Sequence, residues 1–134
     1  MGVLVILKKL KNKLNINLDI KIFKTFYKIL NIETYNLESK YLIFSGIGDP
    51  SSFKDILVEN KFKVAREIVF PDHYDYSLND LEKIRNIAKN ENLKIITTEK
   101  DFMKIPQEFK KEINYLTIDL IIQDERKLIE LLTK

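Results

Sequence analysis

Apolar and polar residues follow two different spacings along this chain, and together these predict an alternation of strands and helices. The run at 3–7 is continuously apolar, and residues 14–22 place an apolar side chain at every second position, as in a strand with one solvated face. Further apolar runs predict strands at 41–44, 62–70, 93–98 and 113–121. Residues 23–39 follow neither spacing clearly and are left unassigned.

Helical spacing appears between these predicted strands. Asp49 suits an N-cap and Pro50 suits the first turn of a helix. The apolar positions of that helix are Phe53, Ile56 and Leu57. Ser77 is expected to cap a second helix. Its apolar stripe consists of Leu78, Leu81, Ile84, Ile87 and Ala88. A short helix before the strand at 113–121 and a final helix at 126–132 complete the series.

This alternation predicts an α/β fold, with a mostly parallel sheet flanked by helices in the Rossmann-like manner and a β segment N-terminal to it. We expect an inter-lobe β segment at 1–40 and an α/β lobe at 41–134. In such sheets, ligands bind beyond the carboxyl ends of the strands. The loops at 45–50, 71–77 and 98–105 each follow a strand, so we expect them to meet at one edge.

Composition narrows the chemistry more than the fold. The 134 residues include no cysteine and a single histidine, His73, so neither a disulfide framework nor a multi-histidine or thiolate metal site is available, and no metal ligands are assigned. A formal net charge of +3 is too small to indicate nucleic acid binding. The basic cluster at 8–13, with four lysines, predicts either a solvated stretch or contact with an anionic membrane surface.

The loop after the strand at 41–44 carries Gly46 and Gly48. Two glycines separated by one residue permit a tight strand-to-helix turn, and they can leave amides at the helix N-terminus free for an anion. A plain structural turn remains an open reading, because Ser51 stands where the third glycine of a dinucleotide fingerprint would be.

Two further loops carry candidate chemistry. Residues 70–74 read Phe-Pro-Asp-His-Tyr, and a carboxylate at Asp72 can orient the His73 imidazole for acid–base work. A lone loop histidine is also commonly a solvated side chain. Residues 97–101 read Thr-Thr-Glu-Lys-Asp, which suits either a phosphorylated or hydroxylated ligand or a helix cap.

Taken in order, the segments 44–50, 70–74 and 97–101 resemble the C-terminal half of the tetraacyldisaccharide 4'-kinase family. The resemblance is firm over 41–105 and looser back to about residue 14 and on to the C-terminus. Asp49 is a departure, since the family usually has asparagine before this proline. The change keeps the N-cap chemistry and adds a negative charge near an expected phosphate site.

The resemblance implies an ATP-dependent kinase of Gram-negative lipid A biosynthesis that phosphorylates the 4' hydroxyl of a lipid A disaccharide precursor at the inner membrane. It implies catalytic roles for His73 and Asp72. It implies substrate binding by Gly46, Gly48, Tyr74, Thr98 and Lys100. In the full-length family, ATP and Mg²⁺ occupy an N-terminal P-loop lobe, and an aspartate of that lobe is thought to pair with the histidine.

No Gly-x-x-x-x-Gly-Lys-Ser/Thr string occurs in these 134 residues. We therefore expect the chain alone to bind neither ATP nor Mg²⁺ and to lack kinase activity. The expected partners are the disaccharide precursor, a P-loop lobe of the same kinase and the inner-membrane surface, with a cytoplasmic, peripheral location. The alternative is a non-catalytic α/β binding module or a decaying gene remnant. The apolar strand at 3–7 has no predicted element before it, which is what a cut through a larger protein would leave and fits the missing nucleotide lobe.

Overall fold

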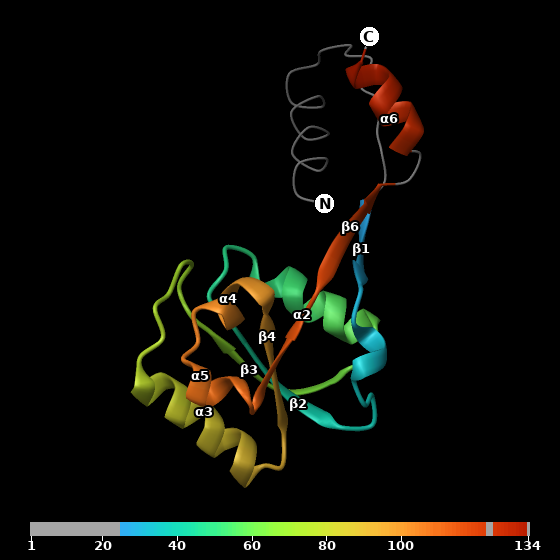
Figure 1. Ribbon diagram of the computed structural model, residues 1–134. Helices are drawn as coiled ribbons and strands as arrows, with labels where there is room; N and C mark the ends of the chain where they lie inside the picture. Colours follow the sequence, from blue (N-terminus) through green and yellow to red (C-terminus); the bar gives the residue numbers. More distant parts are fainter. Residues whose placement is uncertain (1–24, 123–124, 134) are drawn as a thin grey trace, which may run out of the picture. The chain divides into compact units, whose positions relative to one another are not determined.

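The computed structural model describes residues 25–122 and 125–133. The strands predicted at 3–7 and 14–22, and the basic cluster at 8–13, lie outside these residues. The chain divides into two compact units, one formed by Ile29–Thr117 and the other by Met1–Lys28 with Ile118–Lys134 (Figure 1). No helix in the described part of the chain is both long and apolar enough to cross a membrane.

The larger unit alternates strands and helices as the sequence pattern predicts. Its elements are the 3-10 helix η1 (Ile32–Thr34), β2 (Lys40–Ser45), α2 (Pro50–Glu59), β3 (Lys63–Val69), α3 (Leu78–Asn90), β4 (Lys94–Thr98), α4 (Glu99–Met103), α5 (Gln107–Lys110) and β5 (Ile113–Leu116). Among the described residues, the smaller unit contains β6 (Ile118–Ile122), α6 (Glu125–Leu132) and all but the last residue of β1 (Thr25–Ile29).

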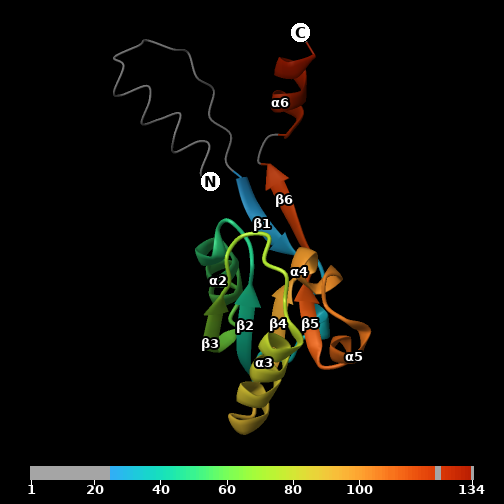
Figure 2. The same cartoon turned by 90° about the vertical axis from the view of Figure 1, so that its left-hand side faces the viewer.

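The larger unit is built on a parallel sheet with the strand order β3-β2-β4-β5 (Figure 2). The chain passes from β2 to β3 on one side and then crosses to β4 on the other side of β2. The point between β2 and β4 is therefore a topological switch point, where parallel α/β sheets form their ligand crevices. The predicted fold class, a mostly parallel sheet flanked by helices, is confirmed.

The central strand β2 is covered on both faces. All residues from Tyr41 to Ser45 are buried, as expected of a central parallel strand. Leu42 and Phe44 share one apolar cluster with Leu81 and other residues of α3. Because side chains alternate along a strand, Tyr41 points to the opposite face, where its ring packs edge-on against Phe62.

The predicted helix caps are present. The Asp49 side chain accepts a hydrogen bond from the Ser52 amide at the start of α2, with Pro50 in the first turn. Ser77 and Asp80 form a reciprocal capping box at the start of α3. Leu78, however, was wrongly placed in the buried stripe of α3, because it is 59% exposed. As the first residue of the helix, it lies ahead of the turn that packs on the sheet.

The single strand predicted at 113–121 is wrong. The structure ends β5 at Leu116 and begins β6 at Ile118, in a different sheet paired with β1. At the break, the Thr117 amide donates to Asn31 Oδ1 over 3.0 Å, and its carbonyl accepts from the Leu30 amide over 2.8 Å. A loop distant in sequence thus takes over both backbone groups of Thr117. Nothing in the apolar run marks this change of partner.

Candidate functional site

The three loops that follow β2, β3 and β4 meet at the carboxyl edge of the sheet, as the sequence predicts. The Phe70 amide donates to the Ser45 carbonyl over 2.8 Å, and the His73 amide donates to the Gly46 carbonyl over 3.1 Å. From the third loop, Asp101 Oδ2 accepts a hydrogen bond of 3.0 Å from the Gly46 amide. The Gly46 peptide therefore contacts both of the other loops, and it lies at the switch point between β2 and β4.

Close approach of these loops explains Gly46 but not Gly48. A Cβ atom on Gly46 would lie 3.1 Å from the Pro71 carbonyl oxygen and 3.1 Å from the Tyr76 hydroxyl, tighter than most real contacts. A Cβ atom on Gly48 would meet only Asp72, at 3.4 Å, which is an ordinary contact. Neither glycine has a positive φ. Gly46 is therefore required by packing against the second loop.

An aromatic cluster supports the second loop. The ring of Phe70 stacks on that of Tyr74, with centroids 4.7 Å apart, and meets that of Tyr76 edge-on at 5.0 Å. Phe44 of β2 packs edge-on against Tyr76 from below. Such contacts add to the stability given by burial alone. The loop that carries His73 is consequently held by a packed base.

His73 itself has a backbone φ of 58°, in the left-handed region that non-glycine residues avoid at a cost of about 1–2 kcal/mol. The amide hydrogen bond to Gly46 holds it there. Backbone strain of this kind is concentrated at functional sites, where neighbouring structure maintains it. Lys61 and Asn92, each one residue after a helix C-cap, share this conformation, so His73 is distinguished by its contacts with Asp72 and Lys100 as well.

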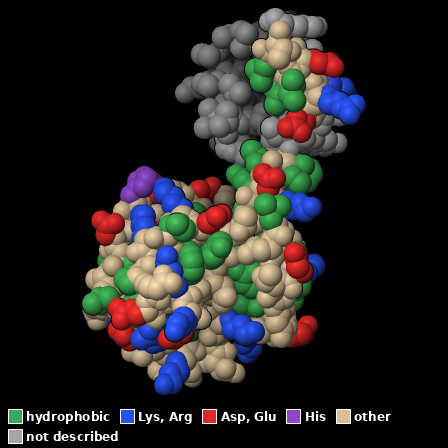
Figure 3. All heavy atoms as spheres, in the orientation of Figure 1, with side chains coloured by type: hydrophobic (Ala, Val, Ile, Leu, Met, Phe, Trp, Pro, Cys, Tyr) green, Lys and Arg blue, Asp and Glu red, His purple; other side chains and the backbone are tan. Residues whose placement is uncertain are grey.

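The His73 imidazole lies between a carboxylate and an ammonium group. Its Nε2 is 3.7 Å from Asp72 Oδ2, and its Nδ1 is 3.4 Å from Lys100 Nζ. An ammonium can only donate, so the contact with Lys100 requires Nδ1 to be unprotonated and places the proton on Nε2, toward Asp72. The His73 side chain is 71% exposed, and Figure 3 shows the histidine at the surface of the larger unit. It is open to a ligand.

Thr98 and Tyr74 hold structural hydrogen bonds within the site. The Thr98 hydroxyl donates to Asp101 Oδ2 over 2.8 Å and accepts from the Asp101 amide over 3.1 Å, so it caps α4. The Tyr74 hydroxyl donates to Asp80 Oδ2 over 2.9 Å, and this hydrogen bond is the main reason why the pKa of Tyr74 is raised. Lys104 Nζ donates to the Tyr74 carbonyl over 3.2 Å.

One interpretation of the sequence leaves the start of α2 open to an anion, but in this chain a carboxylate already occupies it. The Asp49 carboxylate already accepts from the Ser52 amide over 3.2 Å and from the Ser51 hydroxyl over 2.8 Å. The Ser52 hydroxyl also donates to Asp49. This hydrogen bond, followed by the other two, lowers the pKa of Asp49. A carboxylate thus lies at the helix N-terminus where an anion would bind.

The site residues assigned from the sequence do not include Tyr76, and Asp101 was considered only as part of the 97–101 segment. Asp101 is completely buried, and so is the Tyr76 hydroxyl, which lies against Gly46. Burial, followed by the nearby Asp101 charge, raises the pKa of Tyr76. The position of Asp101, three residues after the Thr98 cap, was a visible signal, but only for a local capping role. No group of three potential metal ligands occurs within 25–122 or 125–133.

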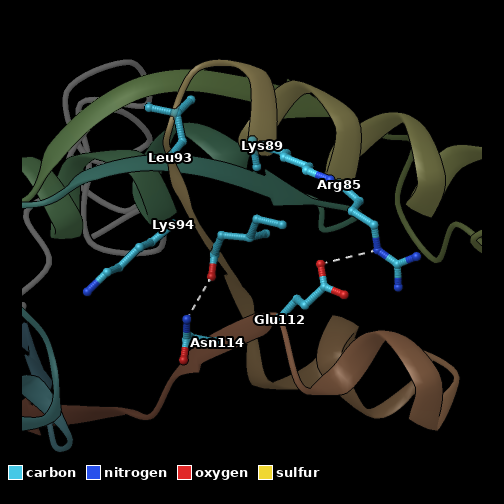
Figure 4. A pocket seen from close by; sticks show the side chains of 8 residues that line it. Arg85, Lys89, Leu93, Lys94, Glu112 and Asn114 are labelled. Carbon is cyan, nitrogen blue, oxygen red and sulfur yellow. Dashed lines mark hydrogen bonds and ion pairs between the residues drawn. The ribbon is translucent and has the colours of Figure 1, made fainter.

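A shallow groove of about 490 Å³ lies away from these loops, beside the amino ends of β4 and β5 (Figure 4). Arg85, Lys89 and Lys94 contribute cations to its lining. Arg85 Nε pairs with Glu112 Oε2 over 3.2 Å, and Asn114 Nδ2 donates to the Ile95 carbonyl over 3.2 Å. None of the residues predicted from the sequence as site residues lines this groove.

Comparison with known proteins yields one consistent similarity. A model of the family described as tetraacyldisaccharide-1-P 4'-kinase matches residues 6–134. The chain is 39% identical over 131 residues to the tetraacyldisaccharide 4'-kinase of Pelagibacter ubique strain HTCC1062, covering 98% of this chain and 41% of the relative. It is 36% identical over 94 residues to the Rickettsia akari protein of the same name, covering 70% of this chain and 29% of the relative.

A solved structure gives the same result. The apo form of LpxK from Aquifex aeolicus, in complex with ATP, superimposes with a TM-score of 0.52 at 27% identity, over 88% of this chain and 37% of that one. The chain thus spans about two fifths of the length of the Pelagibacter ubique and Aquifex aeolicus relatives, and less than a third of the Rickettsia akari protein.

Proposed function

Because the chain belongs to the tetraacyldisaccharide-1-P 4'-kinase family, we propose that it forms the C-terminal lobe of an ATP-dependent kinase that phosphorylates the 4' hydroxyl of a lipid A disaccharide precursor. One observation carries this proposal for the site: at the switch point of the sheet, His73 is held in a left-handed conformation between Asp72 and Lys100. The packed loop below it keeps this arrangement exposed to a ligand.

Each residue of the proposed site has a role that its chemistry allows. The His73 imidazole, with Nδ1 toward Lys100 and Nε2 toward Asp72, can orient a carboxylate or a sugar hydroxyl by donating a hydrogen bond from Nε2. Lys100 supplies a compact positive charge that can approach phosphate oxygens. Phosphoryl transfer depends mostly on positioning and on stabilising charge, so these are the contributions we expect from this lobe.

The nucleotide is held by a different part of the kinase in this proposal. The 134 residues contain no P-loop string, and the Aquifex aeolicus relative, of which this chain covers 37%, was solved with ATP. ATP and Mg²⁺ would supply the phosphoryl group and neutralise its charge from that other lobe. The chain alone would then bind neither of them and would not turn over ATP.

Reconstitution tests this function. The chain is co-expressed with the nucleotide-binding part of the Pelagibacter ubique kinase, and transfer of ³²P from ATP to the tetraacyldisaccharide is measured. We expect product in the mixture and none from either part alone. His73→Gln should remove most of it, whereas Lys89→Gln, in the groove at the other edge of the sheet, should not. A well-folded mixture without product would favour the alternative of a non-catalytic α/β binding module.

We also propose a peripheral position at the inner-membrane surface, because the substrate is a lipid and the cluster at 8–13 is basic. Sedimentation with vesicles that contain anionic phospholipid, at low and high salt, tests this. Binding that fades with salt supports an electrostatic attachment, and absence of binding at low salt contradicts it.

A further inference from the structure

The strongest unassigned feature is the completely buried carboxylate of Asp101, in the first turn of α4. No cation lies within salt-bridge distance of it in the part of the chain that the structure describes. An ionised carboxylate in such a place is costly unless hydrogen bonds satisfy it. Its Oδ2 accepts two, from the Gly46 amide over 3.0 Å and from the Thr98 hydroxyl over 2.8 Å.

The second aspartate in an equivalent position shows what is unusual about Asp101. Asp80 occupies the same place in the capping box of α3, and its Oδ2 accepts from the amide of its own cap, Ser77, over 3.0 Å. In Asp101, Oδ2 instead accepts from the amide of Gly46, 55 residues away along the chain. The N-terminus of α4 therefore has only one half of a capping box, the cap by the Thr98 hydroxyl, and the Asp101 carboxylate binds the loop after β2 in place of the other half.

Gly46 passes this connection on to His73. Its amide donates to Asp101, and the carbonyl of the same residue accepts from the His73 amide over 3.1 Å. The Tyr76 hydroxyl, which would lie 3.1 Å from a Cβ on Gly46, packs against the same residue. A shift of Gly46 would thus be transmitted to the residue that holds the strained backbone.

We propose that Asp101 is a positioning residue for His73: its buried carboxylate anchors the Gly46 peptide, which in turn holds His73 in the left-handed conformation that presents the imidazole between Asp72 and Lys100. Lys100, the neighbour of Asp101 in α4, contacts the imidazole directly. One short helix therefore orients His73 from two sides, through the backbone by Asp101 and through the side chain by Lys100. This role rests on the proposed function only for its effect on catalysis.

Two buried polar atoms beside Gly46 indicate a further interaction of Asp101. Among residues 25–122 and 125–133, no hydrogen-bond partner is present for Asp101 Oδ1 or for the Tyr76 hydroxyl. Both groups lie against Gly46, whose amide donates to Asp101 and whose Cβ position would be 3.1 Å from the Tyr76 hydroxyl. A hydroxyl donor beside a carboxylate oxygen needs only a small displacement to form a hydrogen bond. After such a displacement, Tyr76 would be the third donor to Asp101 and would join the His73 loop to α4.

The geometry is tested on the 134-residue chain by NMR, without any activity. In the wild-type protein we expect scalar couplings across two hydrogen bonds, from the Gly46 amide nitrogen to Asp101 Cγ and from the His73 amide nitrogen to the Gly46 carbonyl carbon. Failure to observe the first coupling in a well-resolved spectrum overturns the proposal. Because this measurement needs no variant, it decides the geometry even if every substitution at Asp101 prevents folding.

Amide exchange then tests the transmission. Asp101→Asn should raise the exchange rates of the Gly46 and His73 amides by about tenfold or more, as expected for loss of a hydrogen bond to a charged group. Asp55→Asn, the same change at an exposed position of α2, should leave both rates within about twofold of wild type. If Asp101→Asn does not fold, Thr98→Val removes one donor to the same carboxylate and should act in the same direction. Unchanged protection of His73 in a folded variant contradicts the role.

Kinetics on the reconstituted kinase separate positioning from stability. Asp101→Asn should lower kcat by about tenfold or more while KM for ATP changes less than about twofold, because His73 acts on the reacting hydroxyl. An equal loss of bound ATP would indicate general damage and overturn the proposal. Should the wild-type mixture make no product, the proposed function fails, and the NMR results still decide whether Asp101 positions His73.

Discussion

Lys100 Nζ lies 3.4 Å from Nδ1 of His73, although Lys100 belongs to α4 and His73 to the loop after β3, 27 positions apart in the chain. This contact joins the only histidine of the sequence to the cation at the carboxyl end of β4. A histidine and a lysine brought together at a switch point suit a site that handles phosphate and hydroxyl groups.

Lys100 is expected to matter for phosphoryl transfer. Lys100→Gln keeps a hydrogen-bond donor on a side chain one atom shorter but removes its charge, so we expect kcat of the reconstituted kinase to fall by about 10–100-fold. Lys89→Gln is the matched control, since Lys89 lines the groove beside the amino ends of β4 and β5. Equal activity of the two variants would count against a role for Lys100.

The two glycines after β2 should respond differently to the same change. Gly46→Ala places a Cβ against the Pro71 carbonyl oxygen and the Tyr76 hydroxyl, both at 3.1 Å, and should lower the free energy of unfolding by about 1–3 kcal/mol. Gly48→Ala meets only an ordinary contact with Asp72 and should change it by less than about 0.5 kcal/mol. Urea denaturation of both variants measures the difference, and similar values would show that the loops can separate freely.

The capping box of α3 should contribute to stability. Ser77→Ala removes the hydroxyl that accepts from the Asp80 amide over 3.1 Å and should cost about 1 kcal/mol. Ser77→Asp retains an acceptor at the cap and should recover most of the loss. Thermal denaturation of the two variants is the measurement. A loss that Ser77→Asp does not recover would mean that packing, rather than capping, is affected.

Alkaline pH should destabilise the larger unit through its half-buried tyrosines. Burial raises the pKa of Tyr35 from 10.0 to about 12. The unfolded chain therefore releases this proton first, so stability is complete below about pH 10 and falls as the pH rises toward 12. Burial also raises the pKa of Tyr76, which adds in the same direction. Urea midpoints at pH 8 to 11 should show a shallower decline for Tyr35→Phe than for wild type, and an identical slope contradicts this assignment.

The order of the elements from β2 to β5 was predictable because it depends on local signals. Apolar runs marked the buried strands, and Asp49 and Ser77 marked the helix starts with hydrogen bonds made within three residues. The meeting of three loops followed from topology, since carboxyl ends of parallel strands share one edge. These are properties that short stretches of sequence carry by themselves.

What was missed depends on partners distant in the chain. Thr117 interrupts an apolar run because Asn31 and Leu30 bind its backbone, and no residue near Thr117 signals this. Likewise, the pattern around Asp101 predicts a capping role, whereas its contact with Gly46 exists only in the folded unit. Tyr76 reads as an ordinary loop tyrosine until it is seen to be buried against that glycine.

The hydrogen bond from the Leu30 amide to the Thr117 carbonyl, 2.8 Å long, brings the two ends of the α/β unit together. A unit whose first and last residues are neighbours tolerates insertion into a host polypeptide without stretching any strand. For the same reason it tolerates circular permutation, in which its ends are joined and new ends are opened elsewhere. Residues 29–117 are thus built like an inserted domain. A longer protein can carry such a domain between two adjacent strands.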